Sequence, residues 1–221
     1  MHFDDQLLQF PLFQGLSRNE MLQMAGNTKF GFMKLRADEV VVRDGDSCSQ
    51  LHFLTKGQMT IIRHSDDHAY SVAEQVHAPW LLQPEVLFGP QTRYTLTAKT
   101  ATEANLMTLT KDEMMRLMDE FLIIRLNMLN LLSALVQRRA NLSWRQAPRS
   151  LRERIIRFFL DHCLYPAGPK EFHILMTRLA NEVGDSRLDV SHELNTMKTD
   201  GLIALHRGRI TIPSIENLLI Q

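Results

Sequence analysis

The sequence predicts an α+β protein built from a strand-rich section, one long helix, and a helix-turn-helix followed by a hairpin. Three observations predict this. Short apolar runs separated by Gly and Asp turns fill the chain up to about residue 109, neither Gly nor Pro occurs from Thr110 to Trp144, and Gly184 separates two short helical patterns. The expected section boundaries are residues 1–110, 111–145 and 146–221.

The chain has 221 residues, of which 44% are apolar, and its formal net charge is zero. The length and apolar content are enough for a folded core. Because the net charge is zero, a charged partner would have to bind a local patch of charge. Its two cysteines are too few for a disulfide framework, a four-cysteine zinc site or an all-cysteine iron–sulfur cluster. The acidic start "MHFDDQLLQF" is unlike a secretory signal, and polar residues interrupt the most apolar segment before it reaches the length of a membrane span. We therefore expect a reduced, cytoplasmic protein.

Four short strands are expected in the first section, at residues 40–42, 51–54, 59–62 and 70–76. "DGD" and "KG" separate the first three, and "SDDH" precedes the fourth. Short strands at this spacing indicate a small barrel or sandwich. Before them, Ser17 and Glu20 stand three positions apart at the start of an apolar pattern, which predicts a helix with a capping box.

The second section has the spacing of a helix that pairs with another helix. Apolar residues alternate by four and three, and Arg138 fills the one polar position of the seam. The predicted dimer interface consists of Ile124, Met128, Leu131, Leu135, Arg138 and Leu142. A second apolar face contains Leu122, Ile123, Leu126, Leu129 and Leu132. A helix packed only on its own barrel is the alternative, but two apolar faces favour two partners, one of them a second subunit.

The third section contains a helix-turn-helix pattern. Thr177 is expected to cap a first helix, Gly184 to end it in the left-handed conformation, and Ser186 to cap a second helix. Val190, Leu194 and Met197 share the inward face of that second helix. Its outward face carries Arg187, Leu188, Ser191, His192, Asn195 and Lys198. In such motifs the second helix enters the major groove of DNA.

A hairpin, "DGLIALHRGRITIP", follows directly, with Arg207 and Arg209 flanking Gly208 as a wing that touches phosphates would require. The predicted DNA-binding residues are Thr177, Ser186, Arg187, Leu188, Ser191, His192, Lys198, Arg207 and Arg209. Four acids lie among them in the sequence, Asp185, Asp189, Glu193 and Asp200. We therefore expect modest non-specific affinity per subunit, which two subunits on one site would offset.

An enzyme is not expected. The segment "HSDDH", from His64 to His68, has metal-ligand residue types but falls at a hairpin tip, where such residues are solvated. No nucleophile elbow, phosphate loop or zinc spacing is present, so no catalytic or metal site is predicted.

In the order of its three sections and in its motifs, the sequence resembles the CRP/FNR family of bacterial transcription regulators. The resemblance rests on "RDGDSCSQLHFLTKGQMTII", "AKTATEANLMTLTKDEMMRL" and "GDSRLDVSHELNTMKTDGLI". It implies a double-stranded β-helix (jelly-roll) barrel like that of cyclic-nucleotide-binding domains, a long dimerisation helix and a winged helix-turn-helix. It also implies a homodimer on a two-fold symmetric double-stranded DNA site, contact with RNA polymerase, and control by a barrel ligand.

Matched to the family's pattern, Ser186 corresponds to a phosphate-contacting helix start and Arg187 to the first base-reading position, where an arginine can bind guanine. Leu188 and His192 occupy reading positions that are often Glu and Arg. These departures imply a different operator, and Leu188 could contact a thymine methyl group.

The effector pocket departs further from the family. Cyclic-nucleotide binders have a Gly-Glu pair and an Arg-Ser/Thr pair, whereas this chain has Leu82-Gln83 before Pro84 and Arg93-Tyr94. The possible pocket residues are Gln83, Glu85, Arg93, Tyr94 and Thr95. Without the matched pairs a cyclic phosphate would be poorly bound, so cyclic AMP is not expected. Glu85 and Arg93 are instead expected to form an internal ion pair.

No cofactor is predicted, since His77 is a lone candidate for haem and Cys48 stands beside acids that disfavour a thiolate. The alternative function is a sensor whose barrel binds a cyclic nucleotide or another metabolite to control DNA binding.

Overall fold

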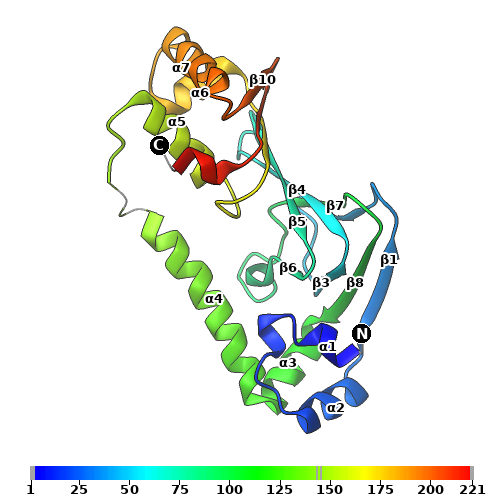
Figure 1. Cartoon of the computed structure of the whole chain (residues 1–221). Coiled ribbons are helices and arrows are strands. Elements are labelled where there is room, and N and C mark those ends of the chain that lie inside the picture. Colours follow the sequence, from blue (N-terminus) through cyan, green and yellow to red (C-terminus); the bar gives the residue numbers. More distant parts are fainter. Residues whose placement is uncertain (1–2, 143, 145, 220–221) are drawn as a thin grey trace. The chain divides into compact units, whose positions relative to one another are not determined.

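The computed structural model describes residues 3–142, 144 and 146–219, and the chain divides into two compact units (Figure 1). The first unit comprises the residues up to Met59 together with Val76–Trp144. The second comprises Thr60–Gln75 together with the C-terminal part of the chain from residue 146 on. Residues 60–75 therefore group with the C-terminal unit, although the sequence boundaries placed them in the barrel section.

Short helices begin the first unit: α1 (Phe3–Leu7), the 3-10 turn η1 (Pro11–Phe13) and α2 (Arg18–Asn27). The predicted capping box of α2 is confirmed. The amide of Glu20 donates to Ser17 Oγ at 3.3 Å, and the amide of Ser17 donates to Glu20 Oε2 at 2.7 Å. Phe10 and Phe13 pack on Phe53 of the sheet, with ring centroids 5.1 and 5.6 Å from it.

The β-rich fold predicted for this unit is present. An antiparallel sheet has the order β1 (Gly31–Leu35), β8 (Ala104–Thr110), β3 (Gln50–Lys56) and β6 (Trp80–Leu82). Its register places Phe53 opposite both Met107 and Leu81. A second pair joins β2 (Val40–Val42) to β7 (Thr97–Thr100), and the 3-10 turn η2 spans Pro84–Val86.

The long helix predicted over residues 111–145 is wrong in one respect, because it is two helices, α3 (Lys111–Glu120) and α4 (Leu122–Leu142). Phe121 between them has extended backbone angles, φ −118° and ψ 104°, and its side chain is buried. The break lets this ring enter the core before the chain turns into α4. The side-chain amide of Asn127 then ties α4 to η1, donating to the carbonyls of Leu12 (3.1 Å) and Gln14 (2.7 Å).

The second unit is a sheet covered by helices. Its strands have the order β10 (Ala204–His206), β11 (Arg209–Ile212), β9 (Lys170–His173), β5 (Ser71–His77) and β4 (Gln58–His64). The helices are α5 (Leu151–Asp161), α6 (Met176–Val183) and α7 (Arg187–Thr199), followed by η3 (Ile215–Leu219). Their apolar faces share one core with the sheet, in which Phe159, Phe172 and Leu179 are fully buried.

No helix within the described residues is both long and apolar enough to cross a membrane.

Candidate nucleic-acid interface

The turn between α6 and α7 has the geometry that its glycine predicts. Gly184 adopts φ 64° and ψ 48°, in the left-handed region. The amide of Asp185 donates to the carbonyl of Ala180 at 3.0 Å, and the amide of Gly184 donates to that of Asn181 at 3.3 Å. This pair of bonds is a Schellman motif, which ends a helix and redirects the chain sharply.

Ser186 caps α7 as predicted. Its Oγ accepts from the amide of Asp189 at 3.1 Å and donates to the Asp189 carboxylate at 2.6 Å. Along α7, Val190, Leu194 and Met197 are completely buried, which confirms the predicted inward face. The cap and the buried face together fix which side of α7 points to solvent.

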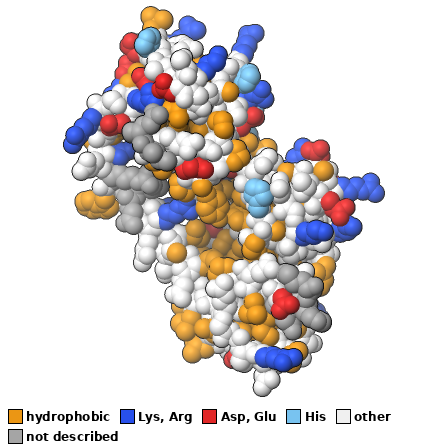
Figure 2. Space-filling model, viewed as in Figure 1, with side chains coloured by type: hydrophobic (Ala, Val, Ile, Leu, Met, Phe, Trp, Pro, Cys, Tyr) orange, Lys and Arg blue, Asp and Glu red, His pale blue; other side chains and the backbone are white. Residues whose placement is uncertain are grey.

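The outward face of α7 is exposed at Arg187, Leu188, His192, Asn195 and Lys198, whereas Ser191 is half-buried. Leu188 has 80% of its surface exposed, an unusual placement for a large apolar side chain. In Figure 2, Lys and Arg side chains are exposed over the elements α6, α7 and β10 of this unit. The helix thus offers an apolar contact group between polar and basic ones.

The predicted hairpin wing is present, with a two-residue turn at Arg207 and Gly208 and with His206 opposite Arg209. Gly208 has φ 70°, as this tight turn requires. Arg209 lies 3.7 Å from Glu171, which itself accepts from His173 at 2.7 Å. One of the two wing arginines is therefore partly neutralised by its own sheet.

A groove of about 340 Å³ brings the α6 start, the α7 start and the wing together. Thr177, Arg187, Arg207 and Arg209 all line it, so four predicted DNA-binding residues from three elements face one space. Among the residues that the structure describes, Arg187, Lys198 and Arg207 form no ion pair. Free guanidinium groups around a groove suit a phosphate backbone.

The prediction that Thr177 caps α6 is wrong. The N-cap is Leu175, which has no side-chain cap and is 63% exposed, because β9 runs almost directly into the helix. The amide of Ile174 still donates to the wing carbonyl of Gly208, at 3.0 Å. Thr177 lies one residue inside the helix and lines the groove, where the helix start favours an anion.

Three of the four acids near the recognition surface are paired with arginines of α5. Arg152 contacts Glu193 at 3.4 Å and Asp200 at 2.9 Å, and Arg154 contacts Asp185. The fourth, Asp189, is the partner of Ser186 Oγ. These acids are therefore less repulsive to DNA than their place in the sequence suggests.

The possible effector-pocket residues bond mainly to one another and to backbone. Gln83, in the left-handed region at φ 31°, donates to Thr95 Oγ1 at 2.7 Å and accepts from the Thr95 amide at 3.1 Å. The buried Tyr94 hydroxyl donates to the Gln50 carbonyl at 3.1 Å and lies 3.2 Å from His52 Nδ1. Burial raises the pKa of Tyr94 and lowers that of His52 to about 4, so both side chains are neutral at pH 7.

The expected ion pair between Glu85 and Arg93 is absent from this described part of the chain. Arg93 is exposed and instead donates to the carbonyl of Gly45 at 2.7 Å. The backbone of Arg93 forms an isolated antiparallel bridge with Ser47.

Among the residues described, no group of three or more His, Cys, Asp or Glu side chains is placed to hold a metal ion. His77 is exposed, and Cys48 is buried. Burial raises the pKa of the Cys163 thiol to about 12, so this thiol is protonated at neutral pH.

Two residues of the predicted dimer seam lie in the chain's own core. Ile124 (0% exposed) and Met128 (3%) are buried within the first unit, because the start of α4 packs on η1 and α3. Leu131 and Leu135 are half-buried and Arg138 is exposed, while the side chain of Leu142 lies outside the described residues. The exposed apolar residues of α4 are instead Leu122, Leu126, Leu129 and Val136.

These four residues, with Ser133, keep the same alternation of four and three, two positions away from the predicted seam. We refer to Leu122, Leu126, Leu129, Ser133 and Val136 as the exposed seam.

Two family models match the sequence. Residues 32–121 match the cyclic nucleotide-binding domain, and residues 153–219 match the Crp-like helix-turn-helix domain. No curated protein matches it.

Solved structures share the fold. The catabolite activator protein of Thermus thermophilus is 20% identical with a TM-score of 0.53, over 95% of this chain and 96% of that chain. A CRP/FNR-family transcriptional regulator from Eubacterium rectale is 18% identical with a TM-score of 0.51, over 95% and 96%. The global regulator CLP of Xanthomonas campestris, described as responsive to c-di-GMP, is 18% identical with a TM-score of 0.50, over 83% and 94%.

Proposed function

The chain belongs to the CRP/FNR family of DNA-binding transcription regulators, and from this premise we propose that it acts as a homodimer that reads a two-fold symmetric DNA site. Each subunit places α7 in a major groove and the wing on the neighbouring phosphates. Contact with RNA polymerase belongs to the same proposal and rests on family membership. The proposal assigns the chain no catalytic step.

The groove shared by α6, α7 and the wing carries the proposal. It brings Arg187, which has no ion-pair partner among the described residues, beside the wing cation Arg207. Arg187 stands at the first turn of α7, where helix-turn-helix proteins read base edges. A guanidinium there can bind O6 and N7 of guanine together.

Replacing Arg187 by Ala tests this role. We expect the variant to lose about 1–3 kcal/mol per half-site at one base position and to bind other sequences almost unchanged. Binding to a randomised duplex library, followed by sequencing of the selected DNA, measures the change. Arg36→Ala is the matched control, because this exposed arginine lies in the first unit and not on the groove. An unchanged recovered motif for Arg187→Ala would remove the base-reading role.

For the dimer, we propose that the exposed seam of α4 pairs with its copy. Its apolar residues are between 45% and 67% exposed, and Leu122, Leu126 and Leu129 recur on one stripe of the helix. In Figure 2, hydrophobic side chains are exposed on the first unit. Paired heptad stripes bury such side chains in two-helix contacts.

We also propose that the barrel pocket is degenerate and does not bind cyclic AMP. Gln83 and Thr95 form hydrogen bonds with each other, and the Tyr94 hydroxyl lies within hydrogen-bond distance of His52. A ligand would have to break these bonds before it formed its own.

The alternative is a sensor for another small molecule, which the match of residues 32–121 to a cyclic nucleotide-binding domain favours. One structural neighbour is described as responsive to c-di-GMP. A thermal-shift panel of cyclic mono- and dinucleotides separates the two proposals. A flat response supports the degenerate pocket, and a concentration-dependent rise in Tm supports the sensor.

A further inference from the structure

The hairpin formed by β4 and β5 is part of the sheet that carries the wing. β5 runs antiparallel to β9, with Ser71 opposite His173, Val72 opposite Phe172 and Glu74 opposite Lys170. On its other edge β9 pairs with β11, the second strand of the wing. Without the hairpin, β9 would be an open edge with unpaired backbone groups.

Apolar side chains of the hairpin complete the core of this unit. Val72 is 3% exposed and belongs to the cluster that contains Phe158 and Phe172. The ring of Tyr70 packs on Phe158 with centroids 5.5 Å apart, and its hydroxyl lies 2.9 Å from Nε2 of His162. The hairpin therefore contacts α5 and β9 together.

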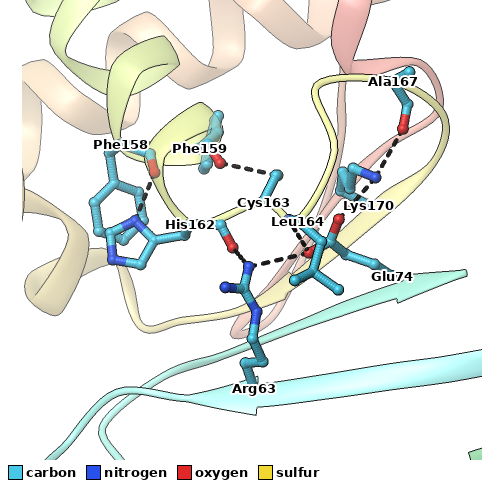
Figure 3. A network of polar contacts seen from close by, with 9 residues as sticks. All are labelled: Arg63, Glu74, Phe158, Phe159, His162, Cys163, Leu164, Ala167 and Lys170. Atoms are coloured by element: carbon cyan, nitrogen blue, oxygen red, sulfur yellow. Dashed lines mark hydrogen bonds and ion pairs between the residues drawn. The ribbon is translucent and has the colours of Figure 1, made fainter. Parts of the chain in front are cut away.

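A buried carboxylate joins the hairpin to the C-terminal segment (Figure 3). Glu74, 2% exposed, contacts Lys170 Nζ at 2.9 Å and Arg63 Nη2 at 3.1 Å. Its Oε1 also accepts from the amide of Leu164 at 2.7 Å, while Arg63 donates to the carbonyl of His162.

Lys170 is itself only 3% exposed. Displacing the hairpin would leave this buried ammonium group without its counter-charge, which is strongly unfavourable.

The tip of the hairpin reaches the first helix of the helix-turn-helix. Asp67 contacts Arg178 Nη1 at 2.9 Å, and the same guanidinium contacts Glu182 at 2.7 Å and lies 5.7 Å from the ring centroid of Tyr70. Arg178 directly follows Thr177, which lines the DNA-facing groove. The hairpin thus contacts α6, whose start lines that groove, and β9, which pairs with the wing strand β11.

We propose that the hairpin, residues 60–75, is a positioning element of the DNA-binding surface and stays docked on β9 and α6 while DNA is bound. This inference rests on the proposed function. The docked hairpin contributes no residue to the groove, and Arg187, Leu188 and Arg207 remain exposed beside it. β4 begins and β5 ends in the first unit, and the hairpin between them contacts α6 through the Asp67–Arg178 ion pair.

A disulfide across β5 and β9 tests the docking in the full-length protein. Ser71 and His173 are directly opposite, so the Cβ atoms of the variant S71C/H173C should lie about 4.5–5.5 Å apart, close to disulfide geometry. We expect an intramolecular disulfide to form on oxidation, seen as two cysteines lost to thiol labelling and a cross-linked peptide pair. Oxidised and reduced protein should bind the selected DNA with Kd values within about two-fold, below 0.5 kcal/mol.

Two results would overturn the inference. If no cross-link forms, the hairpin is not docked. If the cross-link forms but weakens DNA binding about ten-fold or more, and reduction restores it, the hairpin has to leave for DNA to bind. If the proposed function fails, the result differs from both of these: the cross-link forms, but neither the oxidised nor the reduced protein selects any DNA sequence.

Glu74→Gln tests the positioning role. We expect faster amide hydrogen exchange in β9 and α6, unchanged exchange in β3 and β8, and DNA affinity lowered about ten-fold. Glu103→Gln is the matched control, because its exposed ion pair with Lys34 lies in the first unit. If exchange in β9 rises while the DNA Kd stays within two-fold, the hairpin supports the fold without positioning the groove.

Discussion

At the scale of single residues, His52 is a buried titratable group that couples the first unit's stability to pH. It is 5% exposed, and its two ring nitrogens lie 3.2 Å from the Tyr94 hydroxyl and from the Gln50 side-chain amide. Burial lowers its pKa from 6.5 to about 4. Between these values the unfolded chain binds a proton that the folded chain does not, so this contribution to stability is lost as the pH falls from 6.5 toward 4.

His52→Gln should remove this pH dependence. At pH 5 the wild type should have lost about 2 kcal/mol of unfolding free energy, relative to pH 7, that the variant does not lose. Chemical denaturation of both proteins at the two pH values measures the difference, in which the other titrating groups cancel. The exposed His77→Gln serves as the control and should follow the wild type. Equal pH dependence for wild type and His52→Gln would contradict a neutral buried His52.

The residues predicted correctly from the sequence act through local geometry. Ser17, Gly184 and Ser186 need only their neighbours within four residues to cap or end a helix, so their patterns could be recognised directly. Thr177 was misjudged because the start of α6 depends on where β9 ends. Glu74 was missed although the sequence held a signal, since it alternates with Val72 and Val76 on the buried face of its strand.

At the scale of elements, α4 has two apolar faces with the spacing of a helix seam, and part of the face chosen from the sequence is buried in the chain's own core. Both apolar faces of the helix repeat by four and three, and the sequence cannot tell which face meets the chain's own core. The structure settles that point through Asn127, Ile124 and Met128, which face η1 and α3. The opposite face is the exposed seam.

Glutamate substitutions test which face of α4 meets another copy. Leu126→Glu and Leu129→Glu together should raise the dimer Kd on the order of 100-fold, because paired helices would bury four unpartnered carboxylates. Sedimentation velocity across a micromolar concentration series measures the shift. Leu22→Glu on α2, at a position with 56% exposure, is the control and should leave the dimer intact.

The opposite outcome is equally readable. If L126E/L129E stays dimeric while Leu131→Glu or Leu135→Glu dissociates it, the register predicted from the sequence is the contact surface and the exposed seam is not.

At the scale of the whole molecule, the pairing of the hairpin of residues 60–75 with the C-terminal unit could not be predicted from the sequence. Its strands were predicted, yet strand partners are set by edges far apart in the chain, and β5 finds β9 about one hundred residues away. The charge balance of the recognition surface is non-local in the same way. The acids of α7 and of the residues that flank it looked repulsive to DNA, but Arg152 and Arg154 of α5 pair with three of them.

The charge balance of the recognition surface predicts how strongly DNA binding depends on salt concentration. On the recognition surface each protomer offers three exposed cations without an ion pair among the described residues, Arg187, Lys198 and Arg207, and hence a dimer offers six. If all six meet phosphates or displace counterions, the slope of log K against log salt should be about −5. Arg207→Ala should reduce its magnitude by about 2 per dimer and weaken all sequences alike, since a wing arginine meets phosphates.

Fluorescence anisotropy over a salt series, on the selected site and on a scrambled duplex, measures both quantities at once. Lys34→Ala, which removes an exposed cation of the first unit, should leave the slope unchanged. A loss of preference for the selected site in Arg207→Ala, at an unchanged slope, would mean that the wing reads bases. The division of labour between α7 and the wing would then be reversed, because a phosphate contact alters the salt slope whereas a base contact alters the preference between sequences.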